Sequence, residues 1–381
     1  MATPTSTLAP ETRVDPNAPY KELASLLRKG GWFQKEPPIR IVLELVLHVV
    51  LLMAGLTVFI LADNLAVELV ALFVMTAGGL GITTSVHMSS HNASTKSSKV
   101  DKALVFFGYT FVHGMSATYW WNKHVVVHHP NPNIIGVDDD ADLMPVFAIN
   151  IRDKQNSKGF QRFFFTYLQG VLIPFALALN AFNTLRQSWS FLLPILADPK
   201  RRRRLHWIDL GVITSHWLVW FFLPMLFFDP LDVVGFYMLR MGLMGYAAFI
   251  AFAPAHFPDE AVFADKSQED LKDYMLRQTA TTVNFRVGPI GRVFCAGVEY
   301  QIEHHLFPGI PHTYFPALSP IVKKFCDEHN YPYRTLGWGE AILKSFKIFF
   351  HPKPVLDDLE EMHHAAVPVA ATDGQKGQSA S

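Results

Sequence analysis

Long apolar runs constrain this chain more than any other feature. Four of them stand out, at residues 41–62, 65–86, 207–228 and 231–254. A helix rises about 1.5 Å per residue, so each run is long enough to cross a hydrocarbon layer of about 30 Å. Glu44 and Glu68 lie near the ends of the first two runs and are interpreted as structural. We therefore expect an all-α integral membrane protein with four transmembrane helices.

Composition supports a membrane protein and argues against a nucleic-acid partner. Half of the residues are hydrophobic (50%) and only 17% are charged, whereas an average soluble domain has about 25% charged residues. The formal net charge is zero, so nothing attracts nucleic acid. Cys295 and Cys326 are expected to be free thiols in a reducing compartment.

Three histidine clusters flank the apolar runs. They read HMSSH at residues 87–91, HVVVHH at 124–129 and QIEHH at 301–305. Residues three and four apart share a helix face, so each cluster can present two or three ring nitrogens to one point. Seven imidazoles and one amide exceed the four ligands of a closed zinc site, but they suit two iron-type ions with positions open for oxygen. The proposed ligands are His87, His91, His124, His128, His129, His304 and His305.

Basic residues and the histidine clusters together predict the topology. The basic segment before residue 41 should remain in the cytoplasm, so the second span returns the chain to that side at His87. A crossing at residues 103–119 would separate the first two clusters, and a single crossing at 163–182 would strand the third one outside. We therefore expect both stretches to lie in the interface or beside the spans, with a cytoplasmic helical cap holding the histidines.

The chain divides into three parts. Residues 1–40 form an N-terminal tail and an amphipathic interfacial helix, although an ordinary solvated segment fits residues 20–40 equally well. Residues 41–335 form the membrane domain. Residues 336–381 form a C-terminal segment whose small, polar end, from residue 367, is expected to be disordered.

In their order and spacing, the three motifs resemble the histidine boxes of the membrane fatty acid desaturases. The likeness covers residues 40–335, and the GVEYQIEHHLFP run with Gln278, Thr279 and Asn284 is similar to the branch that contains the front-end desaturases. The resemblance implies a non-haem enzyme with two iron ions that removes two hydrogens from a fatty acyl chain, using O2 and two electrons. The sequence contains no HPGG haem motif of a fused cytochrome. An external electron donor of ferredoxin or cytochrome b5 type is therefore expected.

The resemblance also suggests roles for single residues. His256 ends the fourth apolar run, where the family supplies a further metal ligand; a capping role is the alternative. The family allows His or Gln at position 301, and because an amide is a poor iron ligand, Gln301 is expected to hydrogen-bond a metal-bound water. Asn284 could orient a neighbouring ligand. Glu303 is not expected to be a ligand, and Asp138 is expected to support the site or the surface fold.

We expect a desaturase that acts on acyl-CoA, acyl-ACP or acyl-lipid at the cytoplasmic side of the membrane. A hydroxylase or acetylenase is the closest alternative, because the same metals can place oxygen on the substrate or desaturate it twice. A non-catalytic membrane metal-binding protein is a third possibility, but it should carry histidines inside its spans, where only His48 and His216 clearly lie.

Overall fold

The computed structural model describes residues 15–360 and Met362 of the 381-residue chain, so the expected disordered tail lies outside the described residues. It is mostly helical. Five helical segments are long and apolar enough to cross a membrane: Ile39–Leu61, Leu65–Ser89, Gly159–Ala197, Arg204–Leu226 and Pro230–Ala255. The predicted helical membrane architecture is therefore confirmed. The candidate beyond the four that were predicted is Gly159–Ala197, which contains the stretch 163–182 that was expected to lie beside the spans.

Helices α2 (Ile39–Leu61) and α3 (Leu65–Ser89) form an antiparallel pair, joined by a short turn. The side chain of Asn64 caps α3 by accepting a hydrogen bond from the backbone N–H of Ala66. The two backbones pack closely because glycine stands at the contact. A Cβ atom at Gly78 would lie 2.4 Å from the backbone nitrogen of Leu52.

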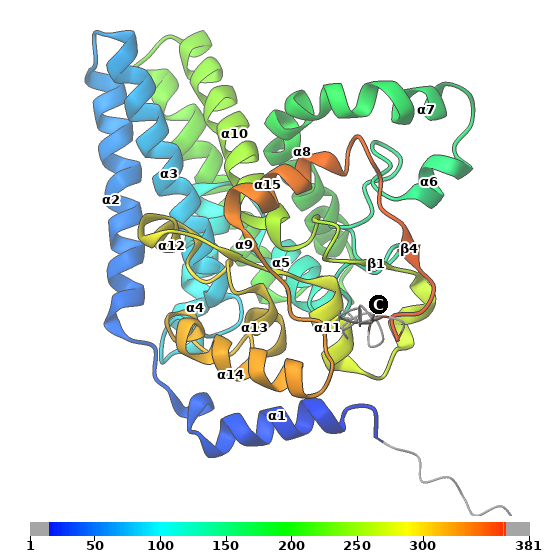
Figure 1. Ribbon diagram of the computed structural model, residues 1–381. Coiled ribbons are helices and arrows are strands. Elements are labelled where there is room, and N and C mark those ends of the chain that lie inside the picture. The colour runs from blue at the N-terminus through cyan, green and yellow to red at the C-terminus, as the bar shows by residue number, and fades with distance from the viewer. Residues whose placement is uncertain (1–14, 361, 363–381) are drawn as a thin grey trace, which may run out of the picture.

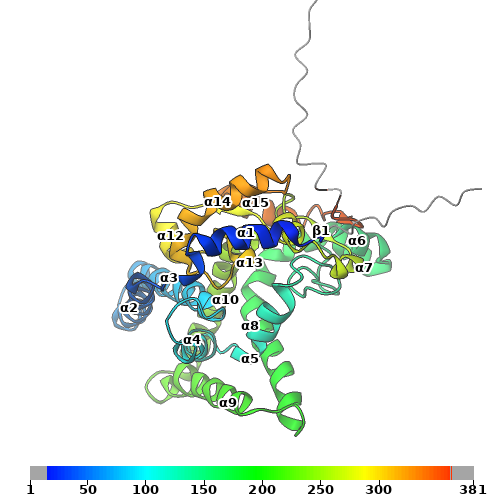
Figure 2. The same ribbon diagram turned by 90° about the horizontal axis from the view of Figure 1, so that it is seen from below.

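The third candidate span is built from α7 (Gly159–Phe163), the π-helical turn η4 (Phe164–Leu168) and α8 (Gln169–Ala197). Figure 2 shows α2 and α3 nearly end-on, whereas α8 is seen along much of its length, so α8 is inclined to that pair. Its first residue, Gln169, is buried and hydrogen-bonds the backbone of Ala148 and Phe349. The start of α8 is therefore tied to the protein.

The last two candidate spans follow directly. They are α9 (Arg204–Trp217), which continues through η5 (Leu218–Phe222) and η6 (Pro224–Leu226), and α10 (Pro230–Phe252), which ends in η7 (Ala253–Ala255). Helix α10 packs closely on α8, because a Cβ atom at Gly245 would lie 2.0 Å from the carbonyl oxygen of Leu177.

Shorter elements gather at the N-terminal end of α2 and the C-terminal end of α3 (Figure 1). They are α1 (Ala18–Lys29), η1 (Trp32–Gln34), α4 (Ser98–Val105), η2 (Phe106–Val112), α5 (Ala117–Trp120), η3 (Trp121–His128), α11 (Tyr274–Thr281), α12 (Pro289–Cys295), α13 (Gln301–Leu306), η9 (His312–Tyr314) and α14 (Phe315–Glu328). The others are α6 (Ile151–Asn156), η8 (Lys266–Asp270) and α15 (Trp338–Lys347). In Figure 1, α6 lies at the right and α15 lies above α11 and α13.

Two short parallel pairs tie the C-terminal region to the rest. Strand β1 (Phe263–Ala264) pairs with β4 (Val355–Leu356), and β2 (Asn284–Arg286) pairs with β3 (Thr335–Gly337). Helix α1 runs along the bottom of Figure 1, beneath α14 and roughly at right angles to α2. Its Leu23 and Leu27 are buried in a core with residues of α11, α13 and α14, while Leu26 remains exposed. The apolar face of α1 is therefore directed largely at the protein.

Candidate metal centre

Eight buried or partly buried histidines gather into two groups beside the end of α3. The first group has five imidazoles, from His87, His91, His124, His129 and His304, and the second has three, from His128, His256 and His305. Within each group the ring nitrogens that could bind a metal lie within 4.8 Å of one another. All eight histidines that the sequence suggested as ligands therefore come together.

The first box lies where α3 ends. His87 is in the last turn of α3, and His91 follows in the turn after it. That turn is closed by a hydrogen bond from the backbone N–H of His91 to the carbonyl of Met88. The chain thus leaves the helix while both rings still point to the same side, with 5.7 Å between their centroids.

The second box lies on the π-helical segment η3, not on an ordinary α-helix. The backbone N–H of His129 bonds to the carbonyl of His124, five residues earlier. This spacing brings the rings of His124 and His129 together edge to face, and 3.1 Å separates their Nε2 atoms. The ring of His128 is directed to the second group instead. Trp120 stacks on His124 with 4.4 Å between ring centroids.

The third box forms the short helix α13. Its adjacent histidines diverge, with ring planes 89° apart, so that His304 joins the first group and His305 the second. The same division separates His129 from His128 in the second box. The His-His pair that ends each of these boxes therefore serves both groups at once.

The donor set fits metal ions. The Nε2 atoms of His87 and His304 are 2.8 Å apart, close to the separation of about 3 Å expected for neighbouring nitrogens bound about 2.1 Å from one ion. Two buried Nε2 atoms, those of His91 and His305, have no hydrogen-bond partner among the described residues, and leaving them so is costly without a bound ion.

Comparison with known proteins identifies the family. A family model described as fatty acid desaturase matches residues 63–337, well over half of the chain. The chain belongs to the fatty acid desaturase family. This confirms the predicted family and the oxidoreductase class, and with the five apolar helices it shows a membrane protein.

Three curated relatives of this desaturase illustrate the likeness. A Delta(8)-fatty-acid desaturase of Arabidopsis thaliana is 24% identical over 341 residues, which cover 86% of this chain and 73% of the relative. An sn-1 linoleoyl-lipid 6-desaturase of Synechocystis is 27% identical, covering 68% and 72%. A Delta(6)-fatty-acid desaturase of Caenorhabditis elegans is 28% identical over 65% of this chain. The chain spans only 56% of that relative.

Burial keeps most of the desaturase imidazoles uncharged. It lowers the pKa of His91 to about 3. Burial is also the largest cause of a pKa well below the ordinary value at five further positions, His124, His129, His256, His304 and His305. A neutral imidazole is the form that binds a metal, so the site is prepared for one.

Side chains outside the boxes orient two imidazoles of the second group. Asp138 lies 2.9 Å from His128 Nδ1, and Gln278 Oε1 lies 2.9 Å from His305 Nδ1. Each oxygen can accept the Nδ1 proton, which leaves Nε2 free to bind a metal. Burial alone would lower the pKa of His128, but the Asp138 carboxylate raises it above its ordinary value.

His256 is held through its backbone. Its carbonyl oxygen accepts hydrogen bonds from Asn133 Nδ2 at 2.9 Å and from Lys353 Nζ at 3.4 Å. Lys353 is buried just before β4 and also donates to the carbonyl of Pro258. The C-terminal segment thus fixes the loop that carries this histidine.

Gln301 belongs to the second group. Its Nε2 lies 2.9 Å from His256 Nε2, and its Oε1 is buried without a partner among the described residues. The amide therefore occupies the side of the site that has fewer imidazoles. This position is compatible with the predicted hydrogen bond to a metal-bound water.

Asn284 supports the third box but touches no imidazole. Its Oδ1 accepts the backbone N–H of Ile302, and its Nδ2 donates to Glu303. Glu303 is fully buried, points away from both groups and also accepts from Tyr333 at 2.6 Å. Burial raises the pKa of Glu303 to about 7, although both hydrogen bonds oppose this. Sequence reasoning missed Tyr333, which lies 30 residues beyond Glu303 and carries no local signal.

Seven other histidines among the described residues lie outside both groups: His48, His113, His206, His216, His312, His329 and His351. Several of their rings contact ordinary hydrogen-bonding partners. For example, His113 Nε2 lies 3.0 Å from the hydroxyl of Thr83, and His216 lies 2.8 Å from the hydroxyl of Tyr237. Cys295 and Cys326 are free thiols, as predicted, and both are buried.

Proposed function

We propose that this protein introduces a C=C double bond into a fatty acyl chain, using O2 and two electrons from a separate ferredoxin or cytochrome b5 type donor. The reaction takes two hydrogens from the chain and, with two protons and two electrons, reduces O2 to two waters. The observation that carries the proposal is the gathering of eight imidazoles into groups of five and three. The name of the Synechocystis relative supports a lipid-linked substrate, besides acyl-CoA and acyl-ACP.

The proposed cofactor is a pair of iron ions, which when bound would supply the oxidising power that no side chain has. The five-imidazole group would hold one ion. The three-imidazole group would hold the other, with the amide of Gln301 beside it. Asp138 and Gln278 keep the rings of His128 and His305 in the metal-binding tautomer. Burial of the rings keeps bulk water away from the reacting carbons.

We also propose four membrane crossings with the metal centre on the cytoplasmic side. The rings of His128 and His256 lie 4.8 Å apart, so the chain between them starts and ends at one place. An even number of crossings must therefore separate them. Three segments lie between them, namely α8, α9 with its continuation, and α10. If each crossed once the number would be odd, so one of the three does not cross. The inclined α8 is the one that we assign to the cytoplasmic side. The basic run 200–204, just before α9, supports this.

Cysteine labelling tests the topology, because native Cys295 and Cys326 are 2% and 0% exposed and should not react. We expect cysteines introduced at Asn92 and Asp198 to be labelled from the cytoplasmic side and one at Asp229 from the opposite side. Labelling of the Asp198 cysteine from the opposite side would show that α8 crosses the membrane.

Gas chromatography of lipids from a host that expresses the chain tests the activity. A new unsaturated acyl chain should appear with the native protein and be absent with His128→Ala at equal expression. Purified active protein should contain about two irons per chain. Hydroxylated or acetylenic products would establish the alternative reactions, and active protein with zinc but no iron would refute the proposed cofactor.

A further inference from the structure

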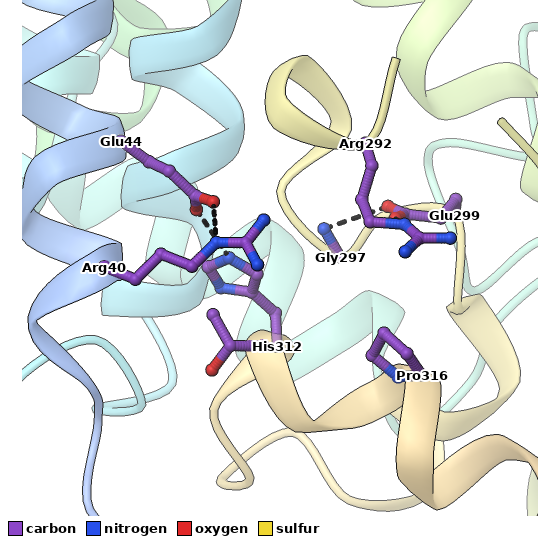
Figure 3. Close-up of a pocket in the computed structure, with 8 residues that line it drawn as sticks. Arg40, Glu44, Arg292, Gly297, Glu299, His312 and Pro316 are labelled. Carbon is purple, nitrogen blue, oxygen red and sulfur yellow. Dashed lines mark hydrogen bonds and ion pairs between the residues drawn. The ribbon is translucent and has the colours of Figure 1, made fainter. Parts of the chain in front are cut away.

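A small polar pocket lies beside the third box, between the start of α2 and the loop that joins α12 to α13 (Figure 3). Its polar lining comes from three separate parts of the chain: Arg40, Glu44, Arg292, Glu299, His312 and Thr313. None of these residues belongs to the two imidazole groups.

Two arginines face each other across this pocket, each held by a glutamate. Arg40 Nε lies 2.7 Å from Glu44, and Arg292 Nε lies 3.9 Å from Glu299. The arginine side chains are 60% and 47% exposed, whereas the glutamates are 10% and 3% exposed. The positive groups therefore lie at the mouth and the carboxylates behind them. Figure 3 shows the guanidinium groups on opposite sides of the pocket.

Several polar atoms of the residues that line the pocket lack partners among the described residues. Within the described residues, the terminal guanidinium nitrogens of Arg40 and Arg292 make no hydrogen bond. His312 is 7% exposed, with Nε2 3.3 Å from Glu44 and a buried Nδ1 that has no partner. The hydroxyl of Thr313 is also buried and unpartnered. Buried polar atoms are nearly always satisfied in folded proteins, so this combination points to a ligand.

We propose that the pocket binds a phosphate group of the acyl carrier, with Arg40 and Arg292 on either side of it. The inference rests on the proposed function and names the class of its substrate. A guanidinium presents two parallel N–H donors that match the oxygens of a phosphate. Arg40 lies in the first turn of α2, where an apolar run begins, and this is the depth at which lipid phosphates lie. A phospholipid and a coenzyme A thioester share this chemistry.

The pocket is close to the metal centre. Glu299 lies two residues before the third box, and Pro316 of the pocket follows Phe315, whose ring centroid is 6.4 Å from that of His304. A carrier phosphate held here would keep the head of the substrate near the imidazoles. Carbons near the carboxyl end, rather than those near the methyl end, would then reach the site.

Calorimetric titration of the iron-loaded protein, in phosphate-free buffer with a non-ionic detergent, tests the site. The probes are short-chain phosphatidylglycerol, coenzyme A and inorganic phosphate, with the matching diacylglycerol as the phosphate-free control. We expect Arg40→Gln and Arg292→Gln each to weaken binding of a phosphate-bearing carrier about tenfold or more. Arg28→Gln, an exposed arginine on α1, should leave it unchanged. The carrier that binds more tightly identifies the source of the phosphate.

Iron content and melting temperature establish that the variants are folded. Arg292→Lys keeps the positive charge but loses the paired N–H donors, so it should bind the carrier with intermediate affinity. The proposal is overturned if neither carrier binds, if inorganic phosphate alone binds, or if Arg28→Gln weakens binding as much as the pocket variants do. Binding is measured without turnover. A protein that binds a carrier through both arginines but makes no unsaturated product would refute the proposed function and leave the site standing.

Discussion

The two imidazole groups differ in how they are built. The first takes five imidazoles from all three boxes, whereas the second takes one each from the second and third boxes and adds His256, which belongs to none. In the first group, the outer nitrogens of His87, His129 and His304 have no partner within the described residues. In the second, Asp138 and Gln278 orient the rings. The first group therefore offers a bound ion more ligands, whereas the second offers fewer ligands whose rings are held in place by hydrogen bonds.

This difference has consequences for a bound ion. Removing one imidazole from the first group leaves four, which is still a full set by the standard of closed metal sites. Removing one from the second leaves two. The second group should therefore be the more sensitive to ligand loss and to changes in the residues that orient its rings.

The adjacent histidines of the third box give the largest expected effect. His305→Ala should retain about one iron per chain and lose activity by more than about 100-fold, because only two imidazoles remain at its position. His304→Ala should also lose activity but retain more iron. Metal analysis and gas chromatography of the two purified variants provide the measurement. Equal iron loss in both would show that the groups are not separate metal positions.

Gln301 tests whether the smaller group uses an amide in place of another imidazole. Gln301→His should still bind two irons and keep partial activity, because an imidazole is itself a suitable metal ligand. Gln301→Leu should keep most of its iron but lose turnover by about 10- to 100-fold, because a polar partner is missing. If Gln301→Leu binds only one iron, the amide is itself a ligand. Normal turnover would show that Gln301 has no role at the centre.

Asp138 tests the support of the second group. Its carboxylate accepts from His128 and also from the backbone N–H of Asn133 at 2.9 Å. Asp138→Asn should weaken iron binding at that position by about 10- to 100-fold. The neighbouring Asp139→Asn, which changes an exposed residue, is the matched control and should bind iron normally. Chelator competition measures both, and equal affinities would remove Asp138 from the site.

Sequence patterns predicted that imidazoles would gather at one metal centre, but not how they divide into two groups. The spacing of the boxes and the His-His pairs were enough to expect several imidazoles at one place. The partition of His128 from His129 depends on the π-helical hydrogen bond of the second box, whereas the spacing argument assumed ordinary helix faces. Such turns depend on tertiary packing and leave no clear mark in one sequence.

Partners distant in the chain were also beyond prediction. Lys353 supports His256 from 97 residues away, and its own backbone is held by hydrogen bonds to Ile149 and Ile151. The long apolar runs were recognisable from length and hydropathy. Composition could not tell whether residues 163–182 cross, because an apolar helix packed beside the spans has the same composition as one that crosses. Only the expected gathering of the histidine clusters on one side predicted that they do not.

The smallest effect of a substitution on the metal centre is expected at the hydrogen bond between Tyr333 and Glu303, because it supports both imidazole groups equally. Helix α13 carries His304 for one group and His305 for the other, and Tyr333 anchors it by donating to Glu303 at 2.6 Å. Tyr333→Phe leaves a buried carboxylate oxygen without that donor, which should lower the free energy of unfolding by about 1–3 kcal/mol.

Tyr314→Phe, which removes an exposed hydroxyl bonded to the carbonyl of Glu36, is the control and should change stability by less than about 0.5 kcal/mol. Denaturant unfolding in detergent, followed by metal analysis, measures both properties. Because α13 moves as a unit, Tyr333→Phe should affect the two metal positions alike. Selective loss of one iron would mean that Glu303 and its partners hold a single imidazole in place, and that the third box is not one rigid support for both groups.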